Sequence, residues 1–242
     1  MWLRQIIKYF RSRSRIIGSL GQPLLFLISF GFGFGSVFQR AGNGNYIEFL
    51  APGIILMSVL FTAIFSGIEV IWDRQFGFLK ETLVAPVSRL HIVLGRTLGG
   101  ATVASIQGLI VFILTLFIGF KPESAGMMLG AFGIMFLVAV LFTSLGTVIA
   151  STMDDMQGFQ LIMNFVVMPI FFLSGALFPL DGLPTALALV TRMNPLTYGV
   201  DAVRGAMVGT NSFSMGLDLA ILITLTAALL GLGSYMFSKI QA

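Results

Sequence analysis

Long uninterrupted apolar segments are the feature of this sequence that most restricts its fold. Six stretches of at least 20 residues run without a charge, at 16–39, 49–68, 97–120, 124–153, 156–180 and 219–238. Each is long enough to cross about 30 Å of hydrocarbon as a helix that rises about 1.5 Å per residue. Membrane β-strands would instead be segments of about 10 residues with alternating character. The sequence therefore predicts an all-α integral membrane protein with six transmembrane helices.

The composition leaves few polar residues from which a soluble domain could be built. Hydrophobic residues make up 57% of the chain and charged residues 10%, whereas soluble domains carry about 25% charged residues. Too few polar residues remain for an attached catalytic domain, so we expect a single transmembrane domain over 1–242. Cysteine is absent, His91 is the only histidine, and no G-x-x-x-x-G-K-[ST] phosphate loop occurs. We therefore expect no catalytic, metal-binding or cofactor-binding residues in this chain, and no nucleic-acid partner.

The basic residues predict the topology. Of the 14 Lys and Arg residues, five lie in the N-terminal segment, four in the loop after the second span and one in the C-terminal tail. Cytoplasmic segments carry the excess of Lys and Arg, so both termini are expected in the cytoplasm and the protein in the cell membrane. A basic segment before an apolar one also resembles a signal peptide. The run at 16–39 is too long for one, and we expect it to be retained as a span.

Residues 1–15 have the pattern of an amphipathic helix. Apolar Leu3, Ile6, Ile7 and Phe10 recur at helical spacing, and Arg4, Lys8, Arg11 and Arg15 occupy another face. Such a helix is suited to lying in the headgroup layer of the membrane. The same charges could also serve only to fix the topology, and the two interpretations are compatible.

A second segment of interest is the predicted cytoplasmic loop 71–96. Phe76, Leu79 and Leu83 share one helical face there, and Pro86 is expected to end the helix. An apolar stripe on a cytoplasmic loop is a candidate docking site for another protein. The alternative is that the stripe folds back onto the ends of the spans, and the pattern alone slightly favours that alternative.

The stretch 181–218 is moderately apolar but cannot span a membrane, because Pro184, Pro195, Asp201 and Arg204 interrupt it. Non-helical backbone at membrane depth must be covered by protein. A re-entrant pair of short helices on the outer side, before the last span, is therefore expected.

Few polar residues lie within the spans or at their edges. Gln107 and Asn164 are expected to form hydrogen bonds between helices. Glu69 lies at the end of its span and is expected to reach the interface rather than to relay protons. Asp154 and Asp155 are expected to form a solvated loop rather than a cation site. Glycine pairs four residues apart at 31 and 35, 95 and 99, and 126 and 130 suit close helix contact.

Two longer stretches resemble a known family. Residues 76–89 read FGFLKETLVAPVSR and are followed by Leu-Gly-Arg at 94–96, while 171–209 contains SGALFPLDGLP at 174–184 and NPLTYGVDAVRGAMVG at 194–209. Together they resemble the membrane subunit of type-2 ABC exporters (ABC-2 type), most closely the drug-resistance and nodulation-type permeases. The resemblance extends over essentially the whole chain.

This resemblance implies a function and two sites. The segment 74–86 would be a coupling helix that docks on a separate cytoplasmic ABC ATPase, with 153–158 as a minor contact, and ATP and Mg would be bound by that ATPase. The implied docking residues are Phe76, Gly77, Phe78, Leu79, Lys80, Glu81 and Thr82. The implied outer gate comprises Pro179, Pro184, Asn194, Pro195, Tyr198, Asp201 and Arg204.

The resemblance also implies how the whole assembly works. Two permease copies, identical or paired with a different one, would export an amphipathic, lipid-like, drug or glycan substrate by alternating access. The alternative from the residues alone is an ATP-independent secondary transporter or channel. The sequence shows neither the internal repeat nor the intramembrane acids common in such carriers.

Overall fold

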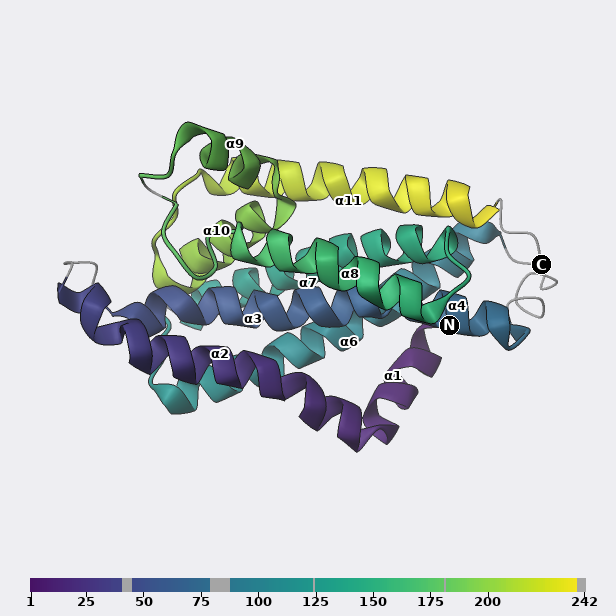
Figure 1. Ribbon diagram of the computed structural model, residues 1–242, viewed down its shortest axis with the longest axis horizontal. Coiled ribbons are helices and arrows are strands. Elements are labelled where there is room, and N and C mark those ends of the chain that lie inside the picture. Colours follow the sequence, from purple (N-terminus) through teal and green to yellow (C-terminus); the bar gives the residue numbers. More distant parts are fainter. Residues whose placement is uncertain (41–44, 79–87, 124, 181, 239–242) are drawn as a thin grey trace.

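The computed structural model describes residues 1–40, 45–78, 88–123, 125–180 and 182–238, and within these ranges the secondary structure is helical (Figure 1). The helices, in chain order, are α1 (Trp2–Arg11), α2 (Arg13–Arg40), α3 (Tyr46–Phe65), α4 (Ile68–Gln75), α6 (Arg89–Ile118), α7 (Ala125–Ser151), α8 (Met156–Phe172), α9 (Thr185–Met193), α10 (Pro195–Val208) and α11 (Met215–Ser238).

Five helical segments are long and apolar enough to cross a membrane, which confirms a helical integral membrane protein. They are Ile16–Gly35, Tyr46–Gln75, Arg89–Ile118, Gly126–Ser151 and Met215–Phe237. The remaining apolar helix, α8, has only 17 residues. The prediction that this helix continues to residue 180 is wrong, because the chain turns after Phe172 and Gly175 takes a left-handed φ of 76°. Apolar residues continue past that turn, so hydropathy alone does not reveal it.

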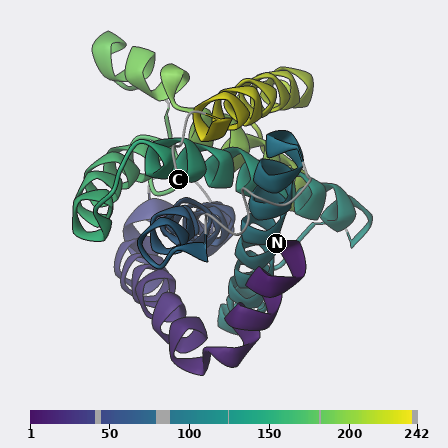
Figure 2. The ribbon, with the colours of Figure 1, turned by 90° about the vertical axis from the view of Figure 1, so that its right-hand side faces the viewer.

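Helix α3 lies at the centre of the bundle, with α2, α6, α7, α8 and α10 packed around it (Figure 2). Its side chains Leu50, Ile54 and Leu60 are fully buried. Where the chain passes from α3 to α4, Gly67 lies directly on the backbone of Gly146 in α7. A Cβ atom on either glycine would overlap backbone atoms of the other segment. These two glycines therefore set the close approach of α3 and α7.

The N-terminal amphipathic helix is shorter than the predicted 1–15 and packs on the bundle. It breaks at Ser12, so residues 13–15 begin α2. Helix α1 lies along α6, where Gly99 faces the side chain of Gln5 and the backbone of Trp2. Of the glycine pairs expected to allow close helix contact, the pair at 95 and 99 therefore lies in the contact between α6 and α1. In the pair at 126 and 130, a Cβ atom on Gly130 would meet only open space.

Both ends of the described chain lie at the same end of the bundle (Figure 1). We call this the proximal end; it also holds α4 and the connection between α7 and α8. The loop predicted at 71–96 is shorter than expected, because α4 continues to Gln75 and α6 already begins at Arg89. The opposite, distal end holds α9 and α10, which are the two short helices expected within 181–218.

Candidate functional sites at the two ends of the bundle

At the proximal end, two aromatic side chains are exposed directly after α4. Phe76 is 63% exposed and Phe78 is 49% exposed, and Gly77 between them turns the backbone with a φ of 79°. The ring of Trp72 lies 5.7 Å from that of Phe76, and the guanidinium of Arg4 lies 5.5 Å from the ring centre of Phe78. The first three predicted docking residues therefore form an exposed aromatic corner. Leu79, Lys80, Glu81 and Thr82 lie outside the described residues.

The carboxylate of Asp73 joins three helices just behind this corner. It accepts a hydrogen bond from Arg4 of α1 at 3.0 Å and pairs with Arg96 of α6. One turn away on α4, Glu69 pairs with Lys8 of α1 at 3.0 Å. The basic face of α1 is thus turned partly toward α4. Glu69 was expected to reach the interface, and in the structure it holds a basic side chain of α1.

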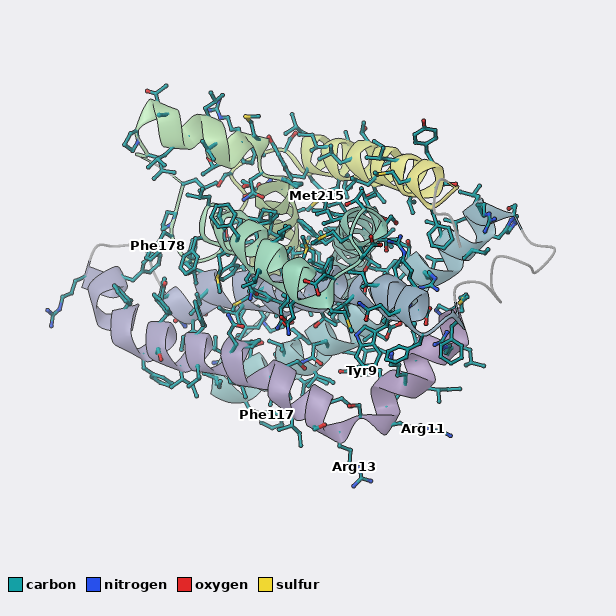
Figure 3. The ribbon with its side chains drawn as sticks, turned by 45° about the vertical axis from the view of Figure 1, so that its right-hand side comes forward. Tyr9, Arg11, Arg13, Phe117, Phe178 and Met215 are labelled. Carbon is teal, nitrogen blue, oxygen red and sulfur yellow. The ribbon has the colours of Figure 1, made fainter. Side chains whose placement is uncertain are left out.

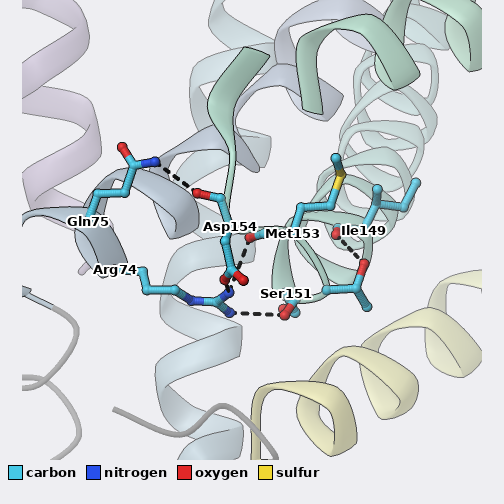
Figure 4. A network of polar contacts seen from close by, with 7 residues as sticks. Arg74, Gln75, Ile149, Ser151, Met153 and Asp154 are labelled. Carbon is cyan, nitrogen blue, oxygen red and sulfur yellow. Dashed lines mark hydrogen bonds and ion pairs between the residues drawn. The ribbon is translucent and has the colours of Figure 1, made fainter. Parts of the chain in front are cut away.

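A second polar network ties α4 to the connection between α7 and α8 (Figure 4). Arg74 donates to the carbonyl oxygens of Ser151 at 3.0 Å and Met153 at 3.1 Å, and it pairs with the carboxylate of Asp154. Gln75 donates to the Asp154 carbonyl at 2.8 Å. The predicted docking segment and the predicted minor contact at 153–158 are therefore adjacent. This role of Arg74 could not be predicted, because in the sequence it looks like any other basic loop residue.

Asp154 and Asp155 both have structural partners. The Asp154 side chain is 86% exposed and bound to Arg74, while the Asp155 carboxylate accepts from the backbone N–H groups of Gln157 and Gly158 at the start of α8. Side-chain oxygens in this position satisfy the free donors of a first helical turn. Among the described residues, no group of three His, Cys, Asp or Glu side chains could hold a metal ion.

Of the two amides expected between helices, only Gln107 fulfils the expectation. It is fully buried in α6, and its Oε1 accepts from the hydroxyl of Tyr9 of α1 at 2.5 Å. Tyr9 points into the molecule, whereas Arg11 and Arg13 point away from it (Figure 3). Asn164 is exposed on α8. The prediction of an interhelical bond from Asn164 is not met by any described hydrogen bond within this chain.

At the distal end, Asn194 and Pro195 form the corner between α9 and α10. The Asn194 side chain accepts from the backbone of Leu196 at 3.0 Å and donates to the carbonyl of Ile170 at 2.6 Å. Pro195 begins α10, where its missing N–H costs nothing. The hydroxyl of Tyr198 donates back to the carbonyl of Arg192 at 2.6 Å. The hairpin is therefore closed on itself and fastened to the end of α8.

Arg204 fastens α10 to the bundle. Its guanidinium lies 3.9 Å from the ring centre of Phe49 and donates to the carbonyls of Gly175 at 2.8 Å and Phe49 at 3.3 Å. Burial lowers the pKa of Arg204 to about 10, so the side chain remains charged at neutral pH. The charge is compensated by carbonyl dipoles and an aromatic face rather than by a direct ion pair.

The predicted gate residues do not all gather in one place. A cavity of about 440 Å³ is lined by Pro179, Asp201 and Arg204 together with Glu48 and other residues of α3 and the 210–212 segment. Asn194, Pro195 and Tyr198 instead form the hairpin corner, and Pro184 precedes α9. One contact residue was missed from the sequence: Phe49, which binds Arg204 through its ring and its carbonyl but looked like an ordinary span residue.

Long apolar helices with most of their polar networks at the two ends define this chain as a multi-pass membrane protein. A sequence model of the ABC-2 type transporter family matches residues 1–208, and the chain belongs to that family. Among similar proteins, Nodulation protein J of Rhizobium leguminosarum bv. trifolii is 31% identical over 86% of this chain and 80% of its own length. The putative transport permease ycf38 of Porphyra purpurea is 30% identical over 98% of this chain and 86% of its own.

Family membership settles the general role. The chain is a permease of the ABC-2 type, which is a transport subunit rather than an enzyme. Permeases of this family work with an ABC ATPase subunit.

Proposed function

We propose that this chain is the permease of an ATP-driven exporter in the cell membrane, with the proximal end facing the cytoplasm. A separate ABC ATPase, which binds the ATP and Mg, docks on the exposed corner after α4. Two permease copies form the membrane core, and the substrate is amphipathic: a lipid-like molecule, a drug or a glycan. The distal hairpin closes the outer end of the pathway by re-entering the membrane.

The observation that carries this proposal is the combination of exposure and anchoring in α4. Phe76 and Phe78 are largely exposed, while Asp73 and Arg74, a few residues earlier, are bound to three other segments. Large aromatic side chains, here held at the end of a fixed helix, are enriched at protein interfaces. An unattached loop would not carry a partner's movement into the bundle.

The contacts of α4 also indicate where such a movement would go. Asp73 connects it to α1 and α6, and Arg74 connects it to the junction of α7 and α8. A ligand shifts a conformational equilibrium only by its different affinity for the two states. Here the ligand is ATP on the partner, so the shift must reach the spans through these contacts.

Docking is tested by coexpressing this chain with its partner ABC ATPase and measuring how much ATPase copurifies. We expect Phe76→Asp to reduce the amount of copurified ATPase at least about tenfold, because a charge would enter an apolar contact at an interface. The matched control is Phe178→Asp, since Phe178 is 49% exposed but lies at the distal end. Undiminished ATPase with Phe76→Asp, in a permease that still inserts, would contradict the proposed docking site.

Transport itself is tested in vesicles that contain both subunits, with a panel of amphipathic drugs, lipids and glycans. Movement that requires ATP and both chains supports the proposal. Movement driven by an ion gradient, with the permease alone, would show a secondary transporter or channel instead.

A further inference from the structure

The basic side chains around the junction of α1 and α2 fall into two groups. Arg4 and Lys8 are turned toward α4, where each is paired with a carboxylate. Arg11, in the last turn of α1, and Arg13, the first residue of α2, are exposed and point away from the molecule (Figure 3). No carboxylate among the described residues forms an ion pair with either of them. The junction therefore carries two positive charges that the described part of the chain does not compensate.

This junction lies where the chain enters the membrane. Helix α1 is broken at Ser12, and the segment that is apolar and long enough to cross a membrane begins at Ile16. At about 1.5 Å per helical residue, Arg13 lies about 5 Å outside the start of that segment. Figures 1 and 2 both show the junction projecting from the side of the bundle. This position corresponds to the level of the lipid headgroups.

A groove of about 990 Å³ opens at the same place. Its lining combines cations, hydroxyl groups and apolar side chains, among them Arg11, Arg13, Ser12, Ser14, Leu3 and Ile7. Guanidinium and hydroxyl groups donate hydrogen bonds to phosphate oxygens. Leu3, Ile7 and Arg11 follow one another at intervals of four residues, so they share one face of α1. The groove therefore offers hydrogen-bond donors and apolar surface side by side.

Exposed apolar side chains continue beside the two cations. Phe10 precedes Arg11, and Ile17 follows Arg13 by about one helical turn on the same face of α2. Both Phe10 and Ile17 are more than half exposed. A nucleic acid or a soluble acidic protein would be bound by the charges alone and would leave these apolar side chains in water. A ligand with an anionic head and apolar tails meets both kinds of residue.

We propose that Arg11 and Arg13 bind the phosphate of an anionic phospholipid in the leaflet at the proximal end of the bundle. The planar guanidinium groups suit phosphate, because their N–H donors match two of its oxygens at once. The acyl chains of the lipid then lie against Phe10 and Ile17. A zwitterionic lipid carries its own cation next to the phosphate, so an anionic lipid is bound more tightly. Such a site goes beyond the proposed transport function and does not depend on it.

The last turn of α1 keeps the bundle and the lipid on different sides. Tyr9 is buried and donates to Gln107 of α6, whereas the next two residues, Phe10 and Arg11, are exposed. One side of the turn is thus held by the bundle, and the other side presents a ring and a cation. A lipid therefore binds here without displacing a contact between α1 and the bundle.

The test measures lipid binding to the purified full chain in detergent by native mass spectrometry, with phosphatidylglycerol and phosphatidylcholine of the same acyl chains. We expect Arg11→Gln combined with Arg13→Gln to weaken the binding of phosphatidylglycerol about 30-fold, or about fivefold for each charge, and to leave phosphatidylcholine unaffected. The matched control combines Arg40→Gln with Arg192→Gln. It removes two exposed charges, at the distal end of α2 and in α9, and should keep the wild-type affinities.

Hydrogen exchange of the wild type provides a second measurement, which holds even if the double variant fails to insert. We expect the amides of residues 10–16 to exchange more slowly in nanodiscs that contain phosphatidylglycerol than in nanodiscs of phosphatidylcholine alone, with no difference in α9. About 1 M salt should abolish this difference, because it shortens the screening length from about 10 Å at 0.1 M to about 3 Å.

Equal affinities of the wild type for the two lipids would overturn the proposal. So would undiminished binding of phosphatidylglycerol to the variant without Arg11 and Arg13, an equal loss in the distal control, or identical exchange of residues 10–16 in the two kinds of nanodisc. Displacement of the lipid by glycerol phosphate at the same concentration would overturn it in favour of a site for a soluble phosphate.

Discussion

The carboxylate of Asp73 on α4 is paired with the guanidinium of Arg96 on α6, and both side chains are less than one tenth exposed. Helix α4 continues from the central helix α3 toward the proximal end, and α6 is a membrane-crossing helix. The pair therefore fixes the segment that bears the exposed aromatic corner to the bundle. Arg4 on α1 binds the same carboxylate and draws the N-terminal helix into this connection.

Replacing Asp73 by Ala should destabilise the protein by about 3 to 5 kcal/mol, because Arg96 would remain buried without its counter-charge. The measurement is equilibrium unfolding of the purified chain in lipid. Asp154→Ala, which breaks an ion pair with an exposed carboxylate, should cost less than about 1 kcal/mol. Equal losses of unfolding free energy for the two substitutions would show that the buried pair stabilises the protein no more than the exposed pair does.

Removal of the Tyr9 hydroxyl should release α1 from α6. Tyr9→Phe leaves the buried Oε1 of Gln107 without its donor, at a cost of about 1 to 3 kcal/mol. Hydrogen exchange of the α1 amides should become roughly tenfold to a hundredfold faster, because each 1.4 kcal/mol is a factor of about ten. Phe10→Leu, at a residue that is 58% exposed on the same helix, serves as the control. Unchanged exchange in Tyr9→Phe would mean that apolar packing alone holds α1.

Two glycines of α7 should respond in opposite directions to the same substitution. Gly146→Ala would place a methyl group against the backbone carbonyl of Ile64, and overpacking of this kind costs about 1 to 3 kcal/mol or more. Gly130→Ala meets nothing within 4 Å and should be neutral or stabilise the helix by about 0.5 to 1 kcal/mol. Unfolding midpoints of the two variants check the prediction. A tolerated Gly146→Ala would show that α3 and α7 can separate at no cost.

Arg204→Lys should loosen the distal hairpin although it conserves the charge. An ammonium group cannot reach both carbonyls and also stack on Phe49. We expect a loss of about 1 to 3 kcal/mol, visible as faster hydrogen exchange in α10 with little change in α6. Arg192→Lys in the exposed last turn of α9 is the control. Retained protection of α10 in Arg204→Lys would indicate that the charge, and not the shape of the guanidinium, holds the hairpin.

The two ends of the molecule differ in how far the sequence predicts them. Pro184 and Pro195 interrupt the hydrophobic pattern visibly, so the two short helices before the last span could be expected from the sequence. The end of α8 could not, because the turn at Gly175 is made of apolar residues that look like more span. Asp218 lies at the boundary of an apolar run, where an acid is ordinary, although its side chain is fully buried in the structure.

Hydropathy is enough to predict that this protein lies in lipid and is helical, because about 20 mostly apolar residues in a row are favourably placed only in lipid and must satisfy their backbone hydrogen bonds as helices. Which polar groups act together depends instead on how the helices pack. Asp73 meets Arg4 and Arg96, and Arg74 meets the α7–α8 junction, across gaps of 23 to 80 residues in the chain. Hydropathy and helical periodicity describe one segment at a time, whereas a buried charge is stabilised by whichever helix packs beside it.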